Sequence, residues 1–230
     1  MNIFAIGDLH LSTAVDKPMD QFGDVWRNHP EKLLRNWKDC VSENDVVLIP
    51  GDISWAMHLA DALPDFAFID ALPGRKILLR GNHDYWWTSL SKIRAALPKS
   101  ITAIQNDAVK LEDKLWIGGT RGWACPSQNA SDADDAKIYA REAGRLKLSL
   151  DAMDDTCPKL IMLHFPPFSE KNGPSEMTEL IEQYRVENVL YAHLHGPAHR
   201  FAFEGERNGV TYRLVSGDYL GFMPKHIMEL

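Results

Sequence analysis

Cysteine is scarce in this chain of 230 residues, and its distribution excludes two common kinds of site. The three cysteines, Cys40, Cys125 and Cys157, are far apart and form no Cys-x-x-Cys motif. An odd and scattered set predicts neither a disulfide framework nor a zinc site built from thiolates. We therefore expect three reduced thiols, which is typical of a cytoplasmic protein.

Long apolar runs and an excess of positive charge are also missing. A membrane-spanning helix would need about 18 consecutive apolar residues, and no such run occurs. Residues 1–8 carry no basic segment ahead of a long apolar one, so they do not predict a signal peptide. The net charge of −7 argues against an extended nucleic-acid surface, because such a surface is broadly basic. A small phosphorylated substrate is still compatible, since bound cations can outweigh the global charge locally.

What the sequence does contain is an alternation of short apolar strands with helical patterns. Hydrophobic residues make up 45% of the chain and charged residues 25%, which is ordinary for a folded domain with a core. The patterns predict strands at residues 2–6, 45–50, 76–80, 101–105, 108–111, 115–118, 159–164 and 188–192. They predict helices from Pro30 onward and over residues 54–72, 86–97, 136–153 and 175–184, the second of them with a break near Pro64. They also predict a hairpin formed by residues 200–204 and 210–216. We therefore expect one α/β domain over residues 1–230.

Side chains that bind metals follow five of the predicted strands, at the point where each strand ends. Open α/β sheets place their chemistry at this edge, because the carboxyl ends of parallel strands meet there. The five blocks are, in chain order, Asp8-Leu9-His10, Gly51-Asp52, Gly81-Asn82-His83-Asp84, His164-Phe165 and His193-Leu194-His195. The sequence therefore predicts that these blocks meet in one site.

Spacing and residue type indicate what the blocks bind. In Asp-x-His and His-x-His pairs, an extended backbone sends both side chains to the same side, so they can reach one ion or two adjacent ions. Gly51 and Gly81 precede ligand candidates, where a residue without a Cβ lets the backbone turn sharply close to an ion. Carboxylate, imidazole and amide donors without a thiolate favour manganese, iron, zinc or a similar ion over calcium.

The number of donors predicts two ions. A single zinc ion takes only about three or four protein ligands. The candidates here number seven, namely Asp8, His10, Asp52, Asn82, His164, His193 and His195. Seven ligands fit a pair of ions that share a bridging carboxylate, and such a centre is suited to clamping phosphoryl oxygens.

In their order and over nearly the whole chain, these blocks resemble the calcineurin-like metallophosphoesterase superfamily. One residue departs from the family's pattern, because Ala192 precedes His193 where the family usually has glycine. The resemblance implies a four-layer αββα sandwich of two mixed β-sheets flanked by helices, the metallo-dependent phosphatase-like fold. It also implies two divalent metal ions, Mn²⁺ in the first place, with Fe, Zn or Ni as alternatives.

The resemblance also implies a role for each block. One ion would be held by Asp8, His10 and His195, the other by Asn82, His164 and His193, and both by a bridging Asp52. A hydroxide between the ions would attack phosphorus in line, and His83 would protonate the leaving group while Asp84 orients its ring. Asp84 could equally cap the helix that follows it. The implied activity is hydrolysis of a small phosphomonoester or phosphodiester, without a choice between the two.

Several features leave alternatives open. Trp55, Trp86, Trp87 and Trp123 follow motif or loop positions, where they could line a substrate pocket or lie in the core. The polar segment Thr120–Asp135 could form a wall of the site or an inert surface loop. The same fold could serve as a silent metal-binding scaffold, and the same centre could hydrolyse amides. The sequence does not determine the oligomeric state.

The remaining histidines and several arginines lie outside the five blocks. We expect His29, His58 and His226 at the surface. Arg80, Arg121 and Arg200 lie near the predicted active loops, where they could hold phosphate, although ordinary ion pairing is the simpler expectation.

Overall fold

Two β-sheets pack face to face in the computed structural model, which describes residues 1–126 and 133–230. The first sheet has the order β11-β1-β2-β3-β4 and consists of β1 (Asn2–Ala5), β2 (Val46–Pro50), β3 (Arg75–Leu79), β4 (Ile101–Ile104) and β11 (Lys225–Glu229). The second has the order β5-β6-β7-β8-β10-β9 and consists of β5 (Ala108–Leu111), β6 (Leu115–Thr120), β7 (Lys159–Leu163), β8 (Asn188–Tyr191), β9 (Gly205–Arg207) and β10 (Val210–Leu214).

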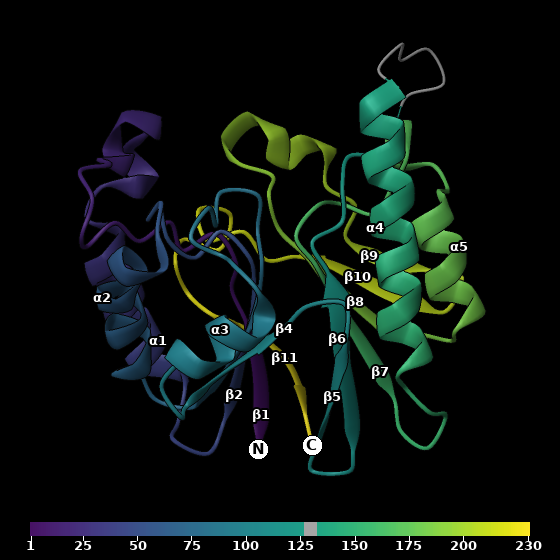
Figure 1. Cartoon of the computed structure of the whole chain (residues 1–230), viewed down its shortest axis with the longest axis horizontal. Helices are drawn as coiled ribbons and strands as arrows, with labels where there is room; N and C mark the ends of the chain where they lie inside the picture. The colour runs from purple at the N-terminus through teal and green to yellow at the C-terminus, as the bar shows by residue number, and fades with distance from the viewer. Residues whose placement is uncertain (127–132) are drawn as a thin grey trace.

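Helices cover the outer face of each sheet (Figure 1). The first sheet is covered by α1 (His29–Cys40), α2 (Leu59–Asp70) and α3 (Leu90–Ala96), and the second by α4 (Ala133–Asp151) and α5 (Glu176–Gln183). The predicted αββα sandwich of two mixed sheets is therefore confirmed. Among the described residues, no helix combines the length and apolar character that crossing a membrane requires.

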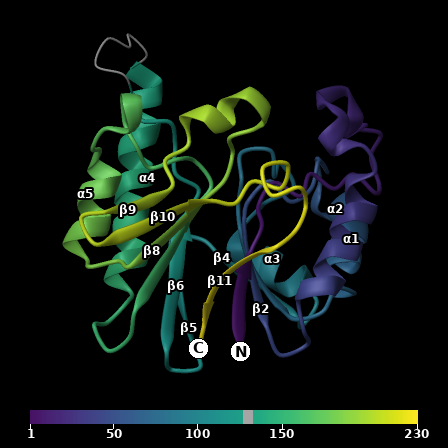
Figure 2. The same ribbon diagram turned by 180° about the vertical axis from the view of Figure 1, so that it is seen from behind.

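The parallel strands of both sheets point the same way. Strands β1 to β4 are mutually parallel, as are β6, β7, β8 and β10, while β5, β9 and β11 are antiparallel to their neighbours. The two ends of the chain lie side by side, because the first strand, β1, pairs antiparallel with the last, β11 (Figure 2). They lie at the edge of the sandwich where the parallel strands begin. The carboxyl ends of the parallel strands therefore meet at one edge of the sandwich, which is where the five blocks lie.

Burial on both faces explains why the central strands are continuous apolar runs rather than alternating ones. In β2, Val47 and Ile49 pack under the helices, whereas Val46 and Leu48 pack against the second sheet. Each such side chain stabilises the fold by about 1.5–3 kcal/mol when it is fully buried. The loops that carry the blocks therefore project from a rigid double layer.

Two helix predictions were wrong in their limits. Helix α2 begins at Leu59 and runs through Pro64 without a break, because Ala62, Phe66 and Ile69 anchor both sides of the proline in the core. Packing of an apolar face can outweigh the cost of about 3 kcal/mol that proline imposes on a helix. The helix predicted for 86–97 is confined to α3, since Trp86 and Trp87 lie in a turn before it.

Other differences concern the later part of the chain. Residues 200–204 form no strand, because a 3₁₀ helix over Gly196–Phe201 precedes the hairpin of β9 and β10. Strand β11 was not predicted, since only Ile227 of its residues is buried. The predicted loop 120–135 begins after β6 and ends where α4 starts at Ala133, and its residues 127–132 lie outside the described residues. All three cysteines are free thiols, as expected.

Candidate metal centre

The five blocks come together between the two sheets. Asp8, His10 and His195 form one group and Asp8, Asp52 and His164 another, and within each group the potential ligand atoms lie within 4.8 Å of one another. Asn82 adjoins the second group, with its Oδ1 2.6 Å from His164 Nε2. The His193 ring lies beside His164, with ring centroids 5.1 Å apart. The structure thus gathers all seven predicted ligands, with Asp8 common to both groups.

Each aspartate in the centre has one oxygen fixed by the backbone of another loop. Asp8 Oδ2 accepts a hydrogen bond of 3.0 Å from the His193 N–H, and Asp52 Oδ1 accepts one of 2.8 Å from the His83 N–H. The other oxygens, Asp8 Oδ1 and Asp52 Oδ2, are buried and accept no hydrogen bond from any described residue. Buried carboxylate oxygens require a partner, so these two fit ligands of a cation.

The imidazoles present lone pairs to the same space. His164 Nδ1 lies 3.0 Å from the Pro50 carbonyl oxygen, to which it can only donate, so Nε2 is the basic nitrogen in the neutral ring. That Nε2 lies 3.4 Å from Asp52 Oδ2, and His10 Nε2 lies 3.4 Å from His195 Nε2. A proton on one of the two histidines would make their contact a hydrogen bond, whereas without it their lone pairs repel one another unless a positive charge lies between them. The donor set therefore fits divalent cations of the manganese, iron or zinc type.

Electrostatics in the centre follow from burial and from the two carboxylates. Burial by itself lowers the pKa of His164, but Asp52 and then Asp8 outweigh it and raise that pKa to about 9. Burial lowers the pKa of His10 and of His193 to about 3, so both rings are neutral at physiological pH. The centre thus combines neutral imidazoles with a place that favours positive charge.

The backbone at the ligands is strained. Four of them are in the left-handed region, with φ of 53° at Asp8, 43° at His10, 52° at Asp52 and 73° at His193. Such conformations cost about 1–3 kcal/mol each and are concentrated at functional sites. The two predicted glycines are tightly enclosed, since a Cβ on Gly81 would lie 2.1 Å from Asp52 Oδ1 and one on Gly51 2.7 Å from His164 Nδ1.

His83 lies at the rim of the centre rather than in it. Its ring is half-buried, with its centroid 5.8 Å from that of His10, and its Nδ1 lies 3.2 Å from the Tyr85 hydroxyl oxygen. Burial lowers its pKa below the ordinary value. The ring therefore faces the space in front of the centre.

Asp84 does not make the predicted contact with the His83 ring. Its buried carboxylate accepts hydrogen bonds from the N–H groups of Gly81, Asp52, Ile53 and Ser54 and from the Trp86 indole. Burial and the nearby Asp52 raise its pKa to about 6. Asp84 thus joins the loops after β2 and β3, and no helix begins directly behind it to be capped.

Sequence reasoning missed two residues that position the ligands. Asp218 Oδ1 lies 2.9 Å from His195 Nδ1, and its Oδ2 accepts the Gly196 N–H at 2.9 Å. His29, which was expected at the surface, is buried, with its Nε2 3.1 Å from the Leu9 carbonyl oxygen and its Nδ1 3.2 Å from that of Trp26. The Gly217-Asp218 pair follows β10 as Gly51-Asp52 follows β2, so a signal for Asp218 was present.

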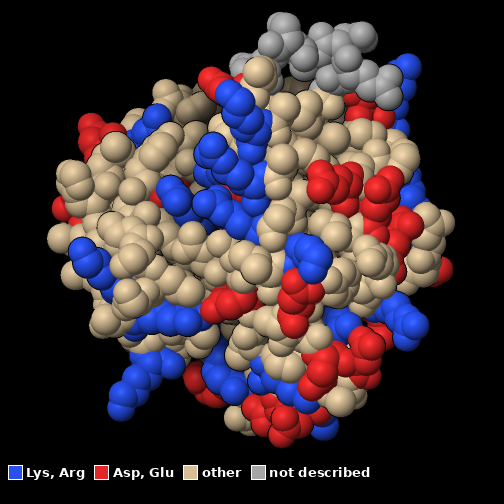
Figure 3. Space-filling model, turned by 45° about the vertical axis from the view of Figure 1, so that its right-hand side comes forward, with Lys and Arg blue, Asp and Glu red and all other residues tan. Residues whose placement is uncertain are grey.

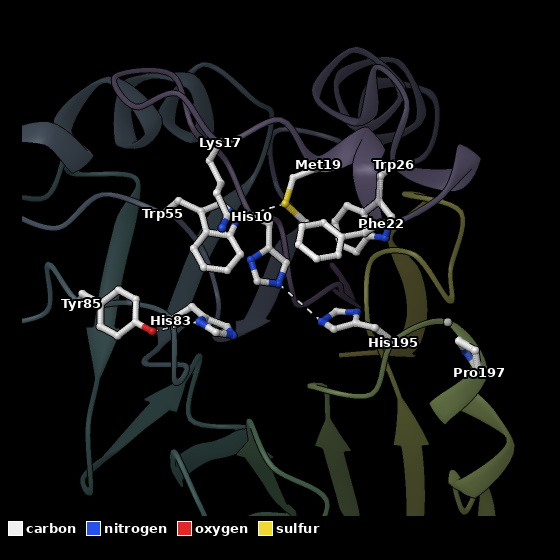
Figure 4. A pocket seen from close by; sticks show the side chains of 11 residues that line it. His10, Lys17, Met19, Phe22, Trp26, Trp55, His83, Tyr85, His195 and Pro197 are labelled. Carbon is white, nitrogen blue, oxygen red and sulfur yellow. Dashed lines mark hydrogen bonds between the residues drawn. The ribbon is translucent and has the colours of Figure 1, made fainter.

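A pocket of about 590 Å³ opens in front of the centre (Figure 4). His10, His83 and His195 form its floor, and its walls are mostly aromatic or apolar, namely Met19, Phe22, Trp26, Trp55 and Tyr85, with Lys17 at the side. The Lys17 amine lies 4.6 Å from the centre of the Trp55 ring. Of the four tryptophans in question, Trp55 lines this pocket and Trp86 and Trp87 are in the core. Trp123 is half-buried and packs at a tilt against Phe165, with ring centroids 5.1 Å apart.

The double sheet and its set of carboxylate, imidazole and amide donors define a class, the α/β proteins with a candidate metal centre at the carboxyl ends of their strands. Within that class the assignment is direct, since the family model of the calcineurin-like phosphoesterases matches residues 1–197. The chain belongs to the calcineurin-like phosphoesterase family.

Individual relatives are distant. The Gene 66 protein of Mycobacterium phage D29 is 27% identical over 199 residues, which cover 86% of this chain and 78% of that protein. The phosphopantetheinyl hydrolase PptH from Mycobacterium tuberculosis superimposes with a TM-score of 0.67 at 14% identity, over 100% of this chain and 96% of the other. The protein TT1561 of Thermus thermophilus gives a TM-score of 0.55 at 16% identity, over 84% and 81% of the two chains. These likenesses of structure show the fold.

Proposed function

We propose that this protein is a dinuclear, metal-dependent hydrolase of small phosphoesters, with the seven gathered side chains as its ligands. The observation that carries the proposal is the pair of buried oxygens, Asp8 Oδ1 and Asp52 Oδ2, that no hydrogen bond satisfies. Both point into a space that is shared with four imidazoles and the Asn82 amide. Membership of a phosphoesterase family supports the same reading of the chemistry.

The proposed ligands divide between two ions, and each ion would take ligands from loops of both sheets. Asp8, His10 and His195 would hold one ion, Asn82, His164 and His193 the other, and Asp52 would contact both, since its Oδ2 lies 3.7 Å from His10 Nε2 and 3.4 Å from His164 Nε2. When bound, two divalent cations supply an activated water and neutralise charge on the phosphoryl oxygens. Manganese is our first choice of ion, with iron, zinc or nickel as alternatives.

The protein's own part in the reaction is to orient the ester and to supply a proton. A phosphoryl group at the centre would place its leaving group toward the pocket, because His83 forms part of the pocket floor. The His83 ring is then the proton donor for the departing oxygen, and the Tyr85 hydroxyl 3.2 Å from its Nδ1 holds the ring in place. The aromatic walls suit a leaving group that is flat or apolar.

The direct test uses two chromogenic esters. The purified protein is assayed with p-nitrophenyl phosphate and bis-p-nitrophenyl phosphate, with Mn²⁺ added and after treatment with a chelator, and its metal content is measured as isolated. We expect two ions per chain and turnover of at least one ester that the chelator abolishes. Turnover of one ester in clear preference would also decide between monoester and diester.

Two results would overturn the proposal. One is a metal-loaded protein that hydrolyses neither ester nor any member of a broader panel of nucleotides and phosphosugars, which would favour a silent scaffold. The other is activity that survives complete removal of metal. A metal content of one ion per chain would overturn the dinuclear part alone.

A further inference from the structure

Three arginines gather around a small hollow beside the proposed centre and outside its ligand set. Arg80 follows β3, Arg121 follows β6 and Arg145 lies on α4, and all three line this arginine hollow together with Glu142. Lys and Arg side chains also dominate the upper middle of the molecular face in Figure 3. In a chain with a net charge of −7, such a concentration of positive charge requires a reason.

The only carboxylate that lines the hollow, among the described residues, is already fully used. Glu142 is buried, and its Oε2 accepts hydrogen bonds from the Thr120 hydroxyl at 2.7 Å and the Gly122 N–H at 3.2 Å. Its Oε1 pairs with Arg121 at 3.3 Å and with Arg145 at 2.6 Å. Two guanidinium groups, those of Arg121 and Arg145, therefore share this carboxylate, and Arg80 adds a third positive charge to the hollow.

Two buried donors in the hollow have no hydrogen-bond partner among the described residues. They are the Nε atoms of Arg80 and Arg121, which donate no hydrogen bond within residues 1–126 and 133–230, and no carboxylate of these residues pairs with Arg80. Gln105 also lines the hollow, and its Oε1 accepts from the Trp87 indole at 2.9 Å, so its amide nitrogen is the end available to a ligand. Burial, together with the positive charges of Arg80 and Arg145, lowers the pKa of Arg121.

The hollow adjoins the centre through the chain itself. Arg80 is followed by Gly81 and the proposed ligand Asn82, and the Arg121 carbonyl oxygen accepts the N–H of His164 at 3.0 Å. The Arg121 guanidinium lies 4.7 Å from the Trp123 ring centre, Trp123 contacts Phe165, and Phe165 contacts the His193 ring with centroids 4.1 Å apart. Aromatic surface thus connects the hollow to the ligands.

From these contacts we propose that the arginine hollow binds a second phosphate-type anion of the substrate, while the ester to be cleaved lies at the centre. Guanidinium groups are suited to this because their planar donors match the oxygens of a phosphate. This inference rests on the proposed function and narrows its substrate class to compounds that carry a second phosphate group.

The first experiment measures the hollow without catalysis. Inorganic phosphate is titrated into chelator-treated protein at constant ionic strength, and binding is followed by calorimetry. Arg145→Gln is the test variant, because Arg145 is exposed on α4 and should fold normally, and Arg80→Gln is a second variant. Arg141→Gln is the matched control, since Arg141 is exposed one turn earlier on the same helix and does not line the hollow.

We expect Arg145→Gln and Arg80→Gln to weaken phosphate binding at least about tenfold, as the loss of one charge-assisted hydrogen bond predicts. The Arg141→Gln protein should bind phosphate as the wild type does. Equal affinities in the Arg145 and Arg141 variants would overturn the proposal, because the anion would then be responding to overall charge.

The second experiment asks whether the anion belongs to the substrate. Alkanediol bisphosphates of increasing chain length are compared with the alkyl monophosphates of the same length, in metal-loaded protein. Over one range of chain lengths, the bisphosphate should have a lower KM than the matching monophosphate. Arg145→Gln should raise the KM of that bisphosphate about tenfold, while its kcat and the KM of the monophosphate stay the same. Equal KM values for each pair would exclude a second substrate phosphate, and phosphate binding alone would then identify a free-anion site.

The two proposals fail separately. If the wild type hydrolyses none of these esters, the proposed function is refuted. The phosphate titration would still decide whether the hollow binds anions. If the wild type hydrolyses both series and the Arg145→Gln and Arg141→Gln variants behave alike, the proposed function is supported and the proposed anion site in the hollow is refuted.

Discussion

The metal centre and the pocket in front of it are built in opposite ways. In the centre, the carboxylates are buried, and backbone N–H groups of other loops fix one oxygen of each. In the pocket, the walls are side chains, and two of them remain largely exposed, Phe22 at 55% and Tyr85 at 49%. Groups fixed by the backbone act with defined geometry, whereas exposed walls can adapt to a ligand.

From this difference we infer that catalytic power lies in the centre and substrate selectivity in the pocket. If the centre performs the chemistry, changes there should affect turnover by orders of magnitude. If the pocket only receives the leaving group, changes there should affect KM by small factors and only for some substrates.

The largest effect is expected from Asp52→Asn. This change keeps the shape of the side chain but removes the charge between His10 and His164, whose Nε2 atoms lie 3.7 and 3.4 Å from Asp52 Oδ2. We expect kcat to fall at least about 10³-fold, more than the loss of a single fixed donor usually costs, together with a loss of bound metal. Metal analysis and turnover measured on the same preparation check this.

The control for that variant is Asp20→Asn, an exposed aspartate on the first 3₁₀ helix. It makes the same chemical change at the surface and should leave metal content and turnover unaltered. An Asp52→Asn protein with normal metal content and normal kcat would show that the two ions do not share this carboxylate.

The next effect is expected from His83→Ala. Because His83 lies at the rim and not among the ligands, metal content should be unchanged, while kcat falls by about 10²–10⁴ for an alkyl phosphate. p-Nitrophenyl phosphate should lose much less, since its leaving group departs without a proton. His58→Ala, at an exposed histidine before α2, is the matched control. Equal losses for both leaving groups would remove His83 as the proton donor.

The gathering of the candidate ligands was predictable from the sequence, because they come in short blocks at strand ends. Asp8 and His10 reach the centre from one loop, and His193 and His195 from another. Each pair can therefore be recognised in the sequence by its spacing of two residues. The tightly enclosed Gly51 and Gly81 strengthen that signal, since no side chain fits at either position. The alternation of strand and helix indicated only an α/β domain, and the two-sheet sandwich was implied by the resemblance to the family.

The parts that were missed depend on contacts between distant residues. Asp218 reaches His195 across 23 positions in the chain, and a lone Gly-Asp pair resembles any turn. His29 was expected at the surface because nothing near it in sequence indicates that it packs under the carbonyl groups of Leu9 and His10. Asp84 shows the same limit, because its partners lie on the loop after β2 rather than beside it.

A smaller effect is expected from Asp218→Asn, which tests whether positioning residues belong with the centre or with the pocket. Asp218 holds His195 by a contact of 2.9 Å to Nδ1, so its loss should loosen one ligand. We expect the affinity for Mn²⁺ to fall by about 10–100-fold, with kcat close to the wild-type value once metal is saturating. Titration of activity with Mn²⁺ measures both quantities. A fall in kcat that excess metal does not restore would place Asp218 in the chemistry itself.

The smallest effect is expected from Phe22→Ala, which changes the pocket without touching a ligand. Phe22 is a half-exposed wall residue, so the fold should tolerate the change, and Leu148→Ala on the exposed face of α4 controls for the loss of surface apolar area. Aromatic contacts contribute about 0.5–1.5 kcal/mol, so KM for an aryl phosphate should rise about two- to tenfold. KM for methyl phosphate should stay the same, because a methyl group does not reach the Phe22 ring. The kcat values of the aryl and the methyl ester should also stay the same, because Phe22 does not belong to the metal centre. An equal rise for aryl and methyl esters would mean that the pocket shapes the centre, and the division between rigid chemistry and adaptable selectivity would then fail.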